Sequence, residues 1–555
     1  MSRSWSHPYQ PDAKYQKRVA YFSMEFGIDQ ALKIYSGGLG YLAGSHMRAA
    51  YQLKQNMIGI GMLWKYGYYD QERDEDNKMV ARFNNKRYSY LEDTGIKVEV
   101  TIHNHPVWVK VWYLAPETFG TVPMYLLSTD IDDNDYLARS IMNKLYHPND
   151  ATRVAQSIVL GVGGAKLCEE LGGVDIHHLN EAHSLPAAFY LLSKYNNVDA
   201  VKEKLVFTTH TPVKAGNAVR SIHLLDEMTF FAGVNLDRVR EVTKMYGDDF
   251  EYTPSALRMA KISNGVSQLH GLVANKMWEH YDETSDIIAI TNSQDEVYWK
   301  DAPLYDALNS NDDEALVNRK KELKKELFKV VADQTGNIFD PDVLTIVWAR
   351  RFAGYKRADL IYRDMARYMS LISNENMPVQ MIWAGKPYPE DYGAINKFNE
   401  IEGISRSHKN MAILTGYELN LSGILKGGSD IWLNTPRRPK EASGTSGMTA
   451  AMKGSLNLST NDGWIPEFAK NGVNCFVIPE ADLNAPIEDQ DNHDHVEMMR
   501  MLEEVIVPTY YKNPERWNDI VKNSMRDIVP FFDSKRMADE YYTRLFNVEV
   551  FNTVS

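Results

Sequence analysis

The stretch NTPRRPKEASGTSGMTAAMKGS (434–455) decides how this chain folds. An apolar run, DIWLNT (430–435), leads into it, and a Pro-Arg-Arg-Pro turn and a helical pattern of small residues follow. A buried strand that passes through a turn into a helix is half of a β-α-β unit, so this stretch predicts a parallel α/β sheet. The serines, threonine and glycines at 443–447 exceed what a helix cap requires. We therefore expect that helix start to bind an anion through its amide groups.

Apolar runs of this kind recur along the chain and alternate with helical patterns. We expect strands at VAYFSMEF (19–26), MIGIGMLW (57–64), VKVWYLA (109–115), VPMYLLS (122–128), IHHLNEA (176–182), KLVFTTH (204–210) and IIAITN (287–292), and then at LTIVWARR (344–351), VQMIWAG (379–385), NMAILTG (410–416), DIWLNT (430–435) and GSLNLST (454–460). Segments 152–171 and 265–281 have the apolar spacing of helices. Two such series predict an α/β fold of two doubly wound Rossmann-like domains that face each other across a cleft.

A charged helix at 311–328 is expected at the junction between the domains. We predict an N-terminal domain at 1–305, a C-terminal domain at 306–500, and C-terminal helices at 501–555 that cross back to the first domain. Ligands of open α/β sheets bind beyond the carboxyl ends of the strands, which places the predicted site in the cleft.

The composition excludes several classes of function. A net charge of −13 argues against binding nucleic acid over a broad surface. The two cysteines, Cys168 and Cys475, lie far apart, which favours a reducing, cytoplasmic location and excludes a Cys-rich metal site. The N-terminal residues lack the apolar core of a signal peptide, and we find no apolar run of about 18 residues that predicts a membrane span.

Two segments of the N-terminal half contain candidate ligand-binding residues. In IYSGGLGYLAGSHMRAA (34–50), Gly37 and Gly38 either let backbone amides approach an anion or form a tight turn. In HHLNEAHSLPAA (177–188), Glu181 and His183 are two residues apart, which is poor spacing for a metal site and favours a polar ligand-binding loop.

His210 ends an apolar strand in FTTHTPVKAGN (207–217). A single histidine is often structural, but its place at a strand end next to a second polar strand end favours a function.

A basic cluster follows the strand at 344–351, in the segment WARRFAGYKRADL (348–360). Its members are Arg350, Arg351, Lys356 and Arg357. Such a cluster in an acidic protein is typical of a phosphate or diphosphate site. Glu441, just before the small-residue helix, is placed to accept hydroxyl groups of a sugar beside that anion.

The chain resembles a known family from residue 19 to about 480. The segments SGGLG, HLNEAHS, FTTHTP, NGVSQLHG, ITN, ARRFAGYKRA, AGK, WLNTPRRP, EASGTSGM and DGW occur in the order seen in short-type α-glucan phosphorylases. The resemblance implies the GT-B fold and the transfer of glucose between an α-1,4-glucan and phosphate with retention, with pyridoxal phosphate as cofactor. It places the glucan or oligosaccharide in the N-terminal domain and the phosphorylated donor in the C-terminal domain, and it implies a homodimer.

The resemblance also implies a role for each candidate residue. His210 lies beside the reacting sugar, and Asn292 and Glu441 bind its hydroxyls. Arg351 and Lys356 form the substrate-phosphate pair. The glycine-loop residues beside this phosphate are Gly37 and Gly38, and the active-site loop contains Glu181 and His183. The residues that hold the cofactor phosphate are Arg350, Ser443, Gly444 and Thr445.

One departure from the family changes the expected chemistry. Thr449 stands where the family has the lysine that forms a Schiff base with pyridoxal phosphate, and threonine has no amine. Lys453, one turn later and about 6 Å along the helix axis, is the alternative anchor. Gly423 stands where arginine is expected, and Ser293-Gln294-Asp295 replace the usual Gly-Val-His.

Three hypotheses therefore remain open. The first is a retaining glycosyltransferase that uses a nucleotide-sugar donor without covalent pyridoxal phosphate, because Thr449 makes room for a nucleotide. The second is an α-1,4-glucan phosphorylase that uses glucose 1-phosphate with non-covalent or relocated pyridoxal phosphate. The third is an inactive glucan-binding paralogue. We expect no metal.

Overall fold

The structure is a computed structural model that describes residues 4–549 and divides into two compact units. The first unit contains the chain up to Tyr68, Phe83–Asp295, and the chain from Ser534 onward. The second contains Tyr69–Arg82 and Glu296–Asp533.

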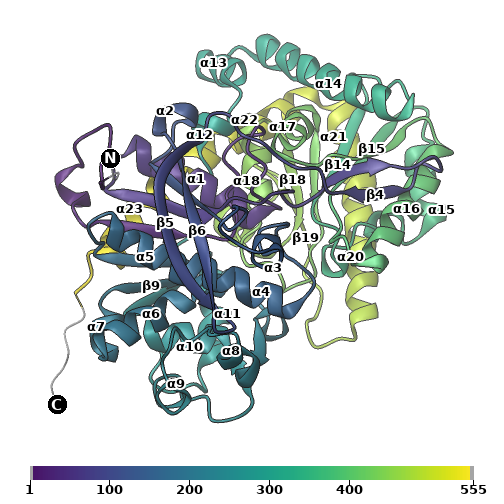
Figure 1. Cartoon of the computed structure of the whole chain (residues 1–555). Helices are drawn as coiled ribbons and strands as arrows, with labels where there is room; N and C mark the ends of the chain where they lie inside the picture. The colour runs from purple at the N-terminus through teal and green to yellow at the C-terminus, as the bar shows by residue number, and fades with distance from the viewer. Residues whose placement is uncertain (1–3, 550–555) are drawn as a thin grey trace. The chain divides into compact units, whose positions relative to one another are not determined.

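The first unit is built on a nine-stranded sheet. In spatial order its strands are β13 (Ile287–Ala289), β12 (Ile262–Gly265), β9 (Leu205–Thr208), β8 (Ile176–Asn180), β1 (Val19–Phe22), β2 (Met57–Met62), β7 (Met124–Ser128), β6 (His105–Leu114) and β5 (Glu92–Ile102). All pairs from β13 to β7 are parallel, whereas β6 pairs antiparallel with both β7 and β5. Figure 1 shows β5 and β6 as two long neighbouring strands.

The helices of the first unit connect these strands, apart from one that follows the last strand of the unit. They are α1 (Gly38–Gln52), α2 (Pro116–Phe119), α3 (Tyr136–Ser140), α4 (Asp150–Ile158), α5 (Gly164–Glu170), α6 (Pro186–Tyr195), α7 (Val198–Lys202), α8 (Ile222–Glu227), α9 (Leu236–Thr243), α10 (Tyr252–Met259), α11 (Gln268–Trp278) and α23 (Ser534–Tyr541). A short antiparallel pair joins β10 (Val219–Ser221) to β11 (Asp249–Glu251).

The second unit has a six-stranded, entirely parallel sheet. Its spatial order is β16 (Met411–Leu414), β15 (Val379–Ala384), β14 (Leu344–Ala349), β17 (Ile431–Asn434), β18 (Leu456–Thr460) and β19 (Phe476–Ile478). Every residue of β14, β15 and β17 is buried, which explains why their sequences are continuous apolar runs.

The helices of the second unit precede, connect or follow the strands of its sheet, and a hairpin completes the unit. The helices are α12 (Glu296–Trp299), α13 (Ala302–Ser310), α14 (Asp313–Thr335), α15 (Met365–Ile372), α16 (Tyr392–Arg406), α17 (Leu419–Gly428), α18 (Thr445–Met452), α19 (Ile465–Phe468), α20 (Ile487–Met501), α21 (Val507–Lys512) and α22 (Pro514–Phe532). The hairpin consists of β3 (Asp70–Arg73) and β4 (Met79–Arg82).

The sequence predicted the α/β class and most of the parallel strands correctly, but it did not predict β12 and β19. Each of the predicted apolar runs contains an observed strand, except 109–115, which covers only the second half of β6, and the predicted helix at 152–171 is α4 and α5 joined through a π-helical turn. Both sheets have the strand order of a doubly wound fold. In each sheet the chain begins at a central strand, adds strands toward one edge, and later adds strands toward the other edge.

The hairpin at 69–82 belongs to the second unit, although the sequence predicted it to be part of the domain at 1–305. Its hydrogen bonds explain this: Gln71 Nε2 donates to the Gly385 carbonyl over 2.9 Å, and Arg73 pairs with Glu402 at 2.6 Å. The chain passes to the second unit at 295/296, before the predicted 305/306, and returns to the first at 533/534, after the predicted 500/501.

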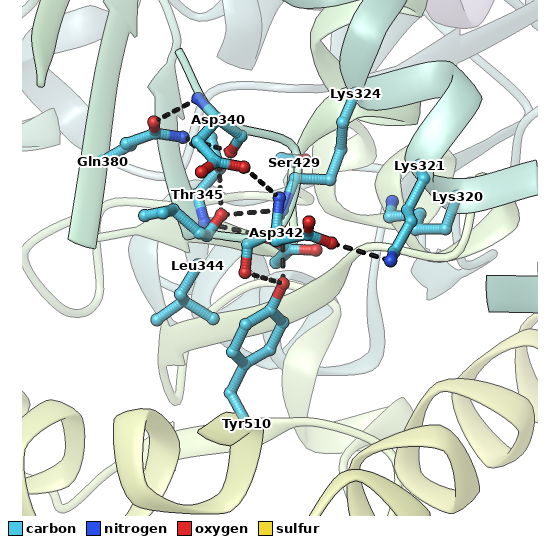
Figure 2. A network of polar contacts seen from close by, with 12 residues as sticks. Lys320, Lys321, Lys324, Asp340, Asp342, Leu344, Thr345, Gln380, Ser429 and Tyr510 are labelled. Atoms are coloured by element: carbon cyan, nitrogen blue, oxygen red, sulfur yellow. Dashed lines mark hydrogen bonds and ion pairs between the residues drawn. The ribbon is translucent and has the colours of Figure 1, made fainter. Parts of the chain in front are cut away.

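A buried ion pair fixes the amino ends of the second sheet. Lys324 of α14 contacts Asp430 over 2.5 Å, and the two side chains are 2% and 4% exposed. Asp430 also accepts the Thr345 amide over 2.8 Å, and Lys324 donates to the Val343 carbonyl over 2.7 Å. Figure 2 shows Lys324 and Thr345 in this network. The pair therefore ties α14 to the first residues of β14 and to the residue before β17.

Replacing Lys324 should destabilise the second unit. In Lys324→Met the Asp430 carboxylate stays buried without its cation, which costs about 3 kcal/mol or more. The midpoint of thermal unfolding should fall by several degrees. Lys321→Met is the matched control, because Lys321 pairs with Asp342 at the surface, where such pairs contribute about 0–1 kcal/mol. Equal shifts in the two variants would contradict the role of the buried pair.

Candidate functional site

In each sheet most of the polar candidate residues follow strands at or next to the point where the strand order reverses; Asn292, which follows the edge strand β13, is the exception. In the second unit this point lies between β14 and β17, which are neighbours although β15 and β16 intervene in sequence. In the first unit it lies between β1 and β8. At such a point, the loops that follow the two neighbouring strands turn to opposite sides. They leave a crevice at the carboxyl ends of the strands, and α/β proteins bind ligands there.

A cluster of three charged side chains occupies the reversal point of the second unit. Arg350 follows β14 directly, and its guanidinium lies 3.0 Å from the Glu441 carboxylate. The Lys356 ammonium donates to the same carboxylate oxygen. All three side chains are at most 12% exposed. Two buried cations thus converge on one oxygen of a single carboxylate.

Charge and burial compete at Glu441. Burial alone would raise the pKa of this carboxyl, but the charges of Lys356 and Arg350 outweigh it and hold the pKa below its usual value. Burial raises the pKa of the neighbouring Asp462 to about 7. Asp462 accepts the Glu441 amide over 2.9 Å, so it fixes the backbone from which the Glu441 side chain leaves.

The start of α18 has the features of an anion cradle. Gly444 precedes the helix with a φ of +93°, and a side chain there would lie 3.1 Å from the Trp464 ring. Thr445 begins the helix. The hydroxyls of Ser443 and Ser446 are buried and, within residues 4–549, have no hydrogen-bond partner. Unpartnered buried hydroxyls next to a helix N-terminus fit a phosphate group.

The predicted basic cluster separates into two roles. Arg350 and Lys356 contact Glu441, and the charge of Arg351 also lowers the pKa of Glu441. Arg357 instead pairs with Asp491 and Asp494 over 2.7 and 2.6 Å. This arginine holds α20 in place and does not belong to the site.

Neither Thr449 nor Lys453 brings an amine to the start of α18. The Thr449 hydroxyl donates to the carbonyls of Thr445 and Ser446 in its own helix. Lys453 lies at the other end of α18, where its side chain passes 3.9 Å from a Cβ built on Gly423 and its charge interacts with Asp301. The cradle therefore fits a phosphate, whereas these two positions do not fit a covalently attached aldehyde.

In the first unit, His210 is held by residues that end β8. His210 Nε2 lies 2.7 Å from Asn180 Oδ1, and its backbone amide donates to Glu181. Thr211 donates to the same Glu181 oxygen over 3.0 Å. Burial lowers the pKa of His210 to about 3, so its imidazole is neutral, and burial raises the pKa of Glu181. A neutral imidazole can accept or donate a hydrogen bond to a sugar hydroxyl.

The glycine loop forms a second group, at the end of β1. The Gly37 amide donates to Glu25 over 3.0 Å, and Tyr146 donates to the other oxygen of Glu25 over 2.6 Å. The Tyr146 ring lies 5.9 Å from the ring of His183, whose Nδ1 is buried without a partner in the described chain. A Cβ added at Gly37 or Gly38 would meet nothing within 4 Å, so both glycines border open space.

Asn292 lies beyond β13 with its side-chain oxygen buried and, among residues 4–549, without a hydrogen-bond partner. The three residues after it have structural contacts. Gln294 accepts from Ser45 over 2.7 Å, Asp295 accepts from Gln52 over 2.7 Å, and Ser293 accepts from Arg536. These contacts tie the loop to α1 and α23, so its unusual sequence has a packing reason.

Three residues that contact the candidates were not predicted: Glu25, Asn180 and Asp462. Asn180 and Asp462 lie inside the quoted segments HLNEAHS and DGW, and Glu25 lies inside the strand predicted at 19–26 but after the end of the observed β1. A polar residue directly after a buried strand was the available signal.

Across residues 4–549, no three His, Cys, Asp or Glu side chains are grouped so that they share a metal ion. Among the helices of this range, none combines the length and the apolar character that crossing a bilayer requires.

Comparisons with known proteins point to one family. The carbohydrate phosphorylase family model matches residues 255–479, which include Arg350, Lys356 and Glu441. An uncharacterised protein of Methanocaldococcus jannaschii is 46% identical over 530 residues, covering 96% of this chain and 100% of that protein. The maltodextrin phosphorylase of Thermococcus litoralis is 32% identical, covering 98% of this chain and 72% of that enzyme. The glycogen phosphorylase of Aquifex aeolicus is 29% identical, covering 96% and 86%.

Removing the Glu441 charge should make the second unit respond to phosphate. In Glu441→Gln two buried cations lose their counter-charge, so the variant should unfold at a lower temperature, and added inorganic phosphate should restore much of the loss. Thermal unfolding with and without phosphate at constant ionic strength measures this. Glu480→Gln is the control, because Glu480 pairs with Arg438 and is 48% exposed. A phosphate response no larger than that of the control would refute an anion site at these residues.

Proposed function

The chain belongs to the carbohydrate phosphorylase family, and we propose that it is a retaining glycosyltransferase that moves glucosyl units onto an α-glucan. We further propose that its donor is a nucleotide sugar and that it holds no covalent pyridoxal phosphate. The homodimer and the cytoplasmic location that the family resemblance implies stay predictions.

One observation carries this proposal. The residues proposed to bind phosphate include Ser443 and Ser446, whose buried hydroxyls have no partner among residues 4–549, whereas position 449 offers a hydroxyl that is bonded to its own helix. This chain keeps the residues that fit a phosphate but lacks the lysine that attaches pyridoxal phosphate in the family. Its phosphate-binding residues are therefore proposed to bind a phosphorylated ligand that needs no such lysine. The relatives named maltodextrin and glycogen phosphorylase support an α-glucan as the other substrate.

Glu441 has two states in the proposed reaction. Without donor it balances Lys356 and Arg350. When the donor phosphate binds Lys356 and Arg350, Glu441 no longer pairs with them and accepts hydrogen bonds from the sugar hydroxyls instead. The exchange replaces one anion by another in a buried site, so the cations are never left without a counter-charge.

Departure of the phosphate-bearing group is the step that these residues assist. Retention without a carboxylate nucleophile requires strong stabilisation of the leaving group as its negative charge grows. Lys356, Arg351 and the amides at the start of α18 supply fixed positive charge for this purpose. In the first unit, His210 and Asn292 are proposed to bind the reacting sugar, as the resemblance implies.

An α-1,4-glucan phosphorylase is the second candidate. The identity of 32% to a maltodextrin phosphorylase favours it, and the unpartnered hydroxyls of Ser443 and Ser446 fit the phosphate of a non-covalent pyridoxal phosphate as well as that of a nucleotide. In this case the partner substrates are glucose 1-phosphate and the glucan.

Donor specificity separates the candidates. The purified protein is incubated with maltooligosaccharide and either UDP-, ADP- or GDP-glucose, or glucose 1-phosphate with added pyridoxal phosphate. We expect chain extension with at least one nucleotide sugar. Phosphate release from glucose 1-phosphate alone would establish the phosphorylase instead. Glucan binding without turnover of any donor would identify an inactive paralogue.

Lys356→Ala and Arg351→Ala should each lower turnover by a factor on the order of 10² or more, because each removes a charge that stabilises the leaving group. The effect should fall on kcat, which steady-state kinetics with the active donor measures. Arg500→Ala serves as control, because Arg500 is 42% exposed and pairs with Glu497 of its own helix. Full activity in both site variants would contradict the assigned role.

A further inference from the structure

The loop that follows β18 packs against the loop that bears Glu441. It continues through Asp462, Gly463 and Trp464. Because β18 pairs in parallel with β17, the loops after both strands leave the same edge of the sheet. The loop after β17 leads to Glu441 and to the start of α18, so the loop after β18 lies next to the candidate anion site.

Three contacts join the two loops. Asp462 accepts the Glu441 amide over 2.9 Å, and the Trp464 amide donates to the Ser443 carbonyl over 2.9 Å. Gly463 leaves no room for a side chain, since a Cβ there would lie 2.3 Å from the Ser443 carbonyl oxygen. The loop after β18 therefore fixes the backbone from which the Glu441 side chain and the Ser443 hydroxyl extend.

The Trp464 ring supports the start of α18 in the same way. A Cβ built on Gly444 would lie 3.1 Å from this ring, and one built on Gly447 would lie 2.9 Å from it. The ring is 2% exposed and packs against Phe468 and Phe532, with ring centroids 4.8 and 5.1 Å away. Because this core is close-packed, the site accommodates a change of bound anion through side chains and protons rather than through a shift of the backbone.

Asp462 is a buried carboxylate that is held by amides alone. It is 2% exposed and accepts the amides of Glu441 and Gly463, each over 2.9 Å. In the described part of the chain, no lysine or arginine forms an ion pair with it. Arg438 acts on it only through its field and pairs with Glu480 at 2.6 Å. A buried carboxylate without a paired cation takes up a proton more readily than an exposed one.

The anion that Lys356 and Arg350 hold determines how much negative charge surrounds Asp462. Burial is the main cause that raises the pKa of Asp462, and the charge of Glu441 raises it further, whereas its two amide bonds and Arg438 lower it. Without donor, the charge of Glu441 is balanced by Lys356 and Arg350. When a phosphate binds these cations, the charges of Glu441 and of the phosphate both act on Asp462. A proton on Asp462 removes one negative charge from the buried site.

We propose that Asp462 is a positioning residue that takes up a proton when the donor phosphate binds. The inference rests on the proposed function, because it requires an anion that displaces Glu441 from its two cations. The proton comes from the solvent and bonds to one carboxylate oxygen, and the other oxygen still accepts the Glu441 amide. When the phosphate leaves, the proton returns to the solvent. The affinity for the anion should therefore fall as the pH rises through the pKa of Asp462.

Titration calorimetry with sulfate on the intact protein tests the proposal. Sulfate resembles phosphate in charge and shape but carries no proton at neutral pH, so any proton taken up goes to the protein. At constant ionic strength, the binding enthalpies in two buffers of different ionisation enthalpy give the number of protons. We expect up to about half a proton near pH 7, because a pKa of about 7 leaves half of the Asp462 side chains already protonated. The affinity should fall several-fold between about pH 7 and about pH 8.

Asp462→Asn mimics the protonated carboxyl. It keeps an oxygen for the Glu441 amide but binds no proton, so the enthalpy should not depend on the buffer. At about pH 8 it should bind sulfate several-fold more tightly than the unmodified protein does. Asp462→Ala also removes the acceptor of the Glu441 amide and should bind more weakly than Asp462→Asn. Asp342→Asn is the control and should behave like the unmodified protein, because Asp342 is 68% exposed and pairs with Lys321 at the surface.

The outcomes separate this proposal from the proposed function. Sulfate binding whose enthalpy is independent of the buffer in the unmodified protein overturns the role of Asp462 and leaves the proposed function standing, even if the variants do not fold. Proton uptake that persists in Asp462→Asn also overturns it, because another group then takes up the proton. If the unmodified protein binds neither sulfate nor any phosphorylated sugar, the proposed function fails, and the role of Asp462 fails with it.

Discussion

Two cations that share one carboxylate are the interaction on which the second unit's site depends. Lys356 and Arg350 are both buried, and without Glu441 or an anion in its place their positive charges would have no counter-charge in this cluster. The strand order brings Glu441 to these two cations, because Glu441 follows β17 and the cations follow the neighbouring strand β14. The two strands are neighbours at the point where the strand order reverses. The order of the strands thus gathers these three charged side chains at one place, and the amide groups at the start of α18 add partial positive charge there.

The same strand order in the first unit produces a different chemistry. There, carboxylates and amides meet at the reversal point, and Glu25 already occupies the amide of the glycine loop. Glu181 holds the His210 backbone in a similar way. These carboxylates satisfy the polar groups of the loops, which leaves a neutral imidazole and an unpartnered asparagine oxygen to meet a ligand. Such groups suit hydroxyls, whereas the second unit suits phosphate.

The sequence predicted most of the parallel strands because strands buried on both faces consist of continuous apolar runs, whereas the short parallel strands β12 and β19 were not predicted. It missed β5, whose residues alternate between exposed and buried, although this period of two is itself a strand signal. The hairpin 69–82 was assigned to the wrong half because continuity of the chain carries no information about its hydrogen-bond partners at Gly385 and Glu402. Of the basic cluster, Arg357 could not be separated from Arg350 by residue type, since its partners lie about 130 residues away. Asn180 and Asp462 lie in recognisable motifs but were not predicted as site residues, and Glu25 has no motif of its own, so all three are identified only by their contacts.

The central claim is that a family member can keep the phosphate cradle and work without an amine-bound pyridoxal. The most direct measurement is the absorption spectrum of the purified protein, followed by its intact mass after borohydride reduction. We expect no band from a pyridoxal group in the near ultraviolet or visible range, and a mass equal to that of the polypeptide. A pyridoxal band together with a mass increase after reduction would contradict the claim, because it would show that a lysine elsewhere in the chain carries the cofactor.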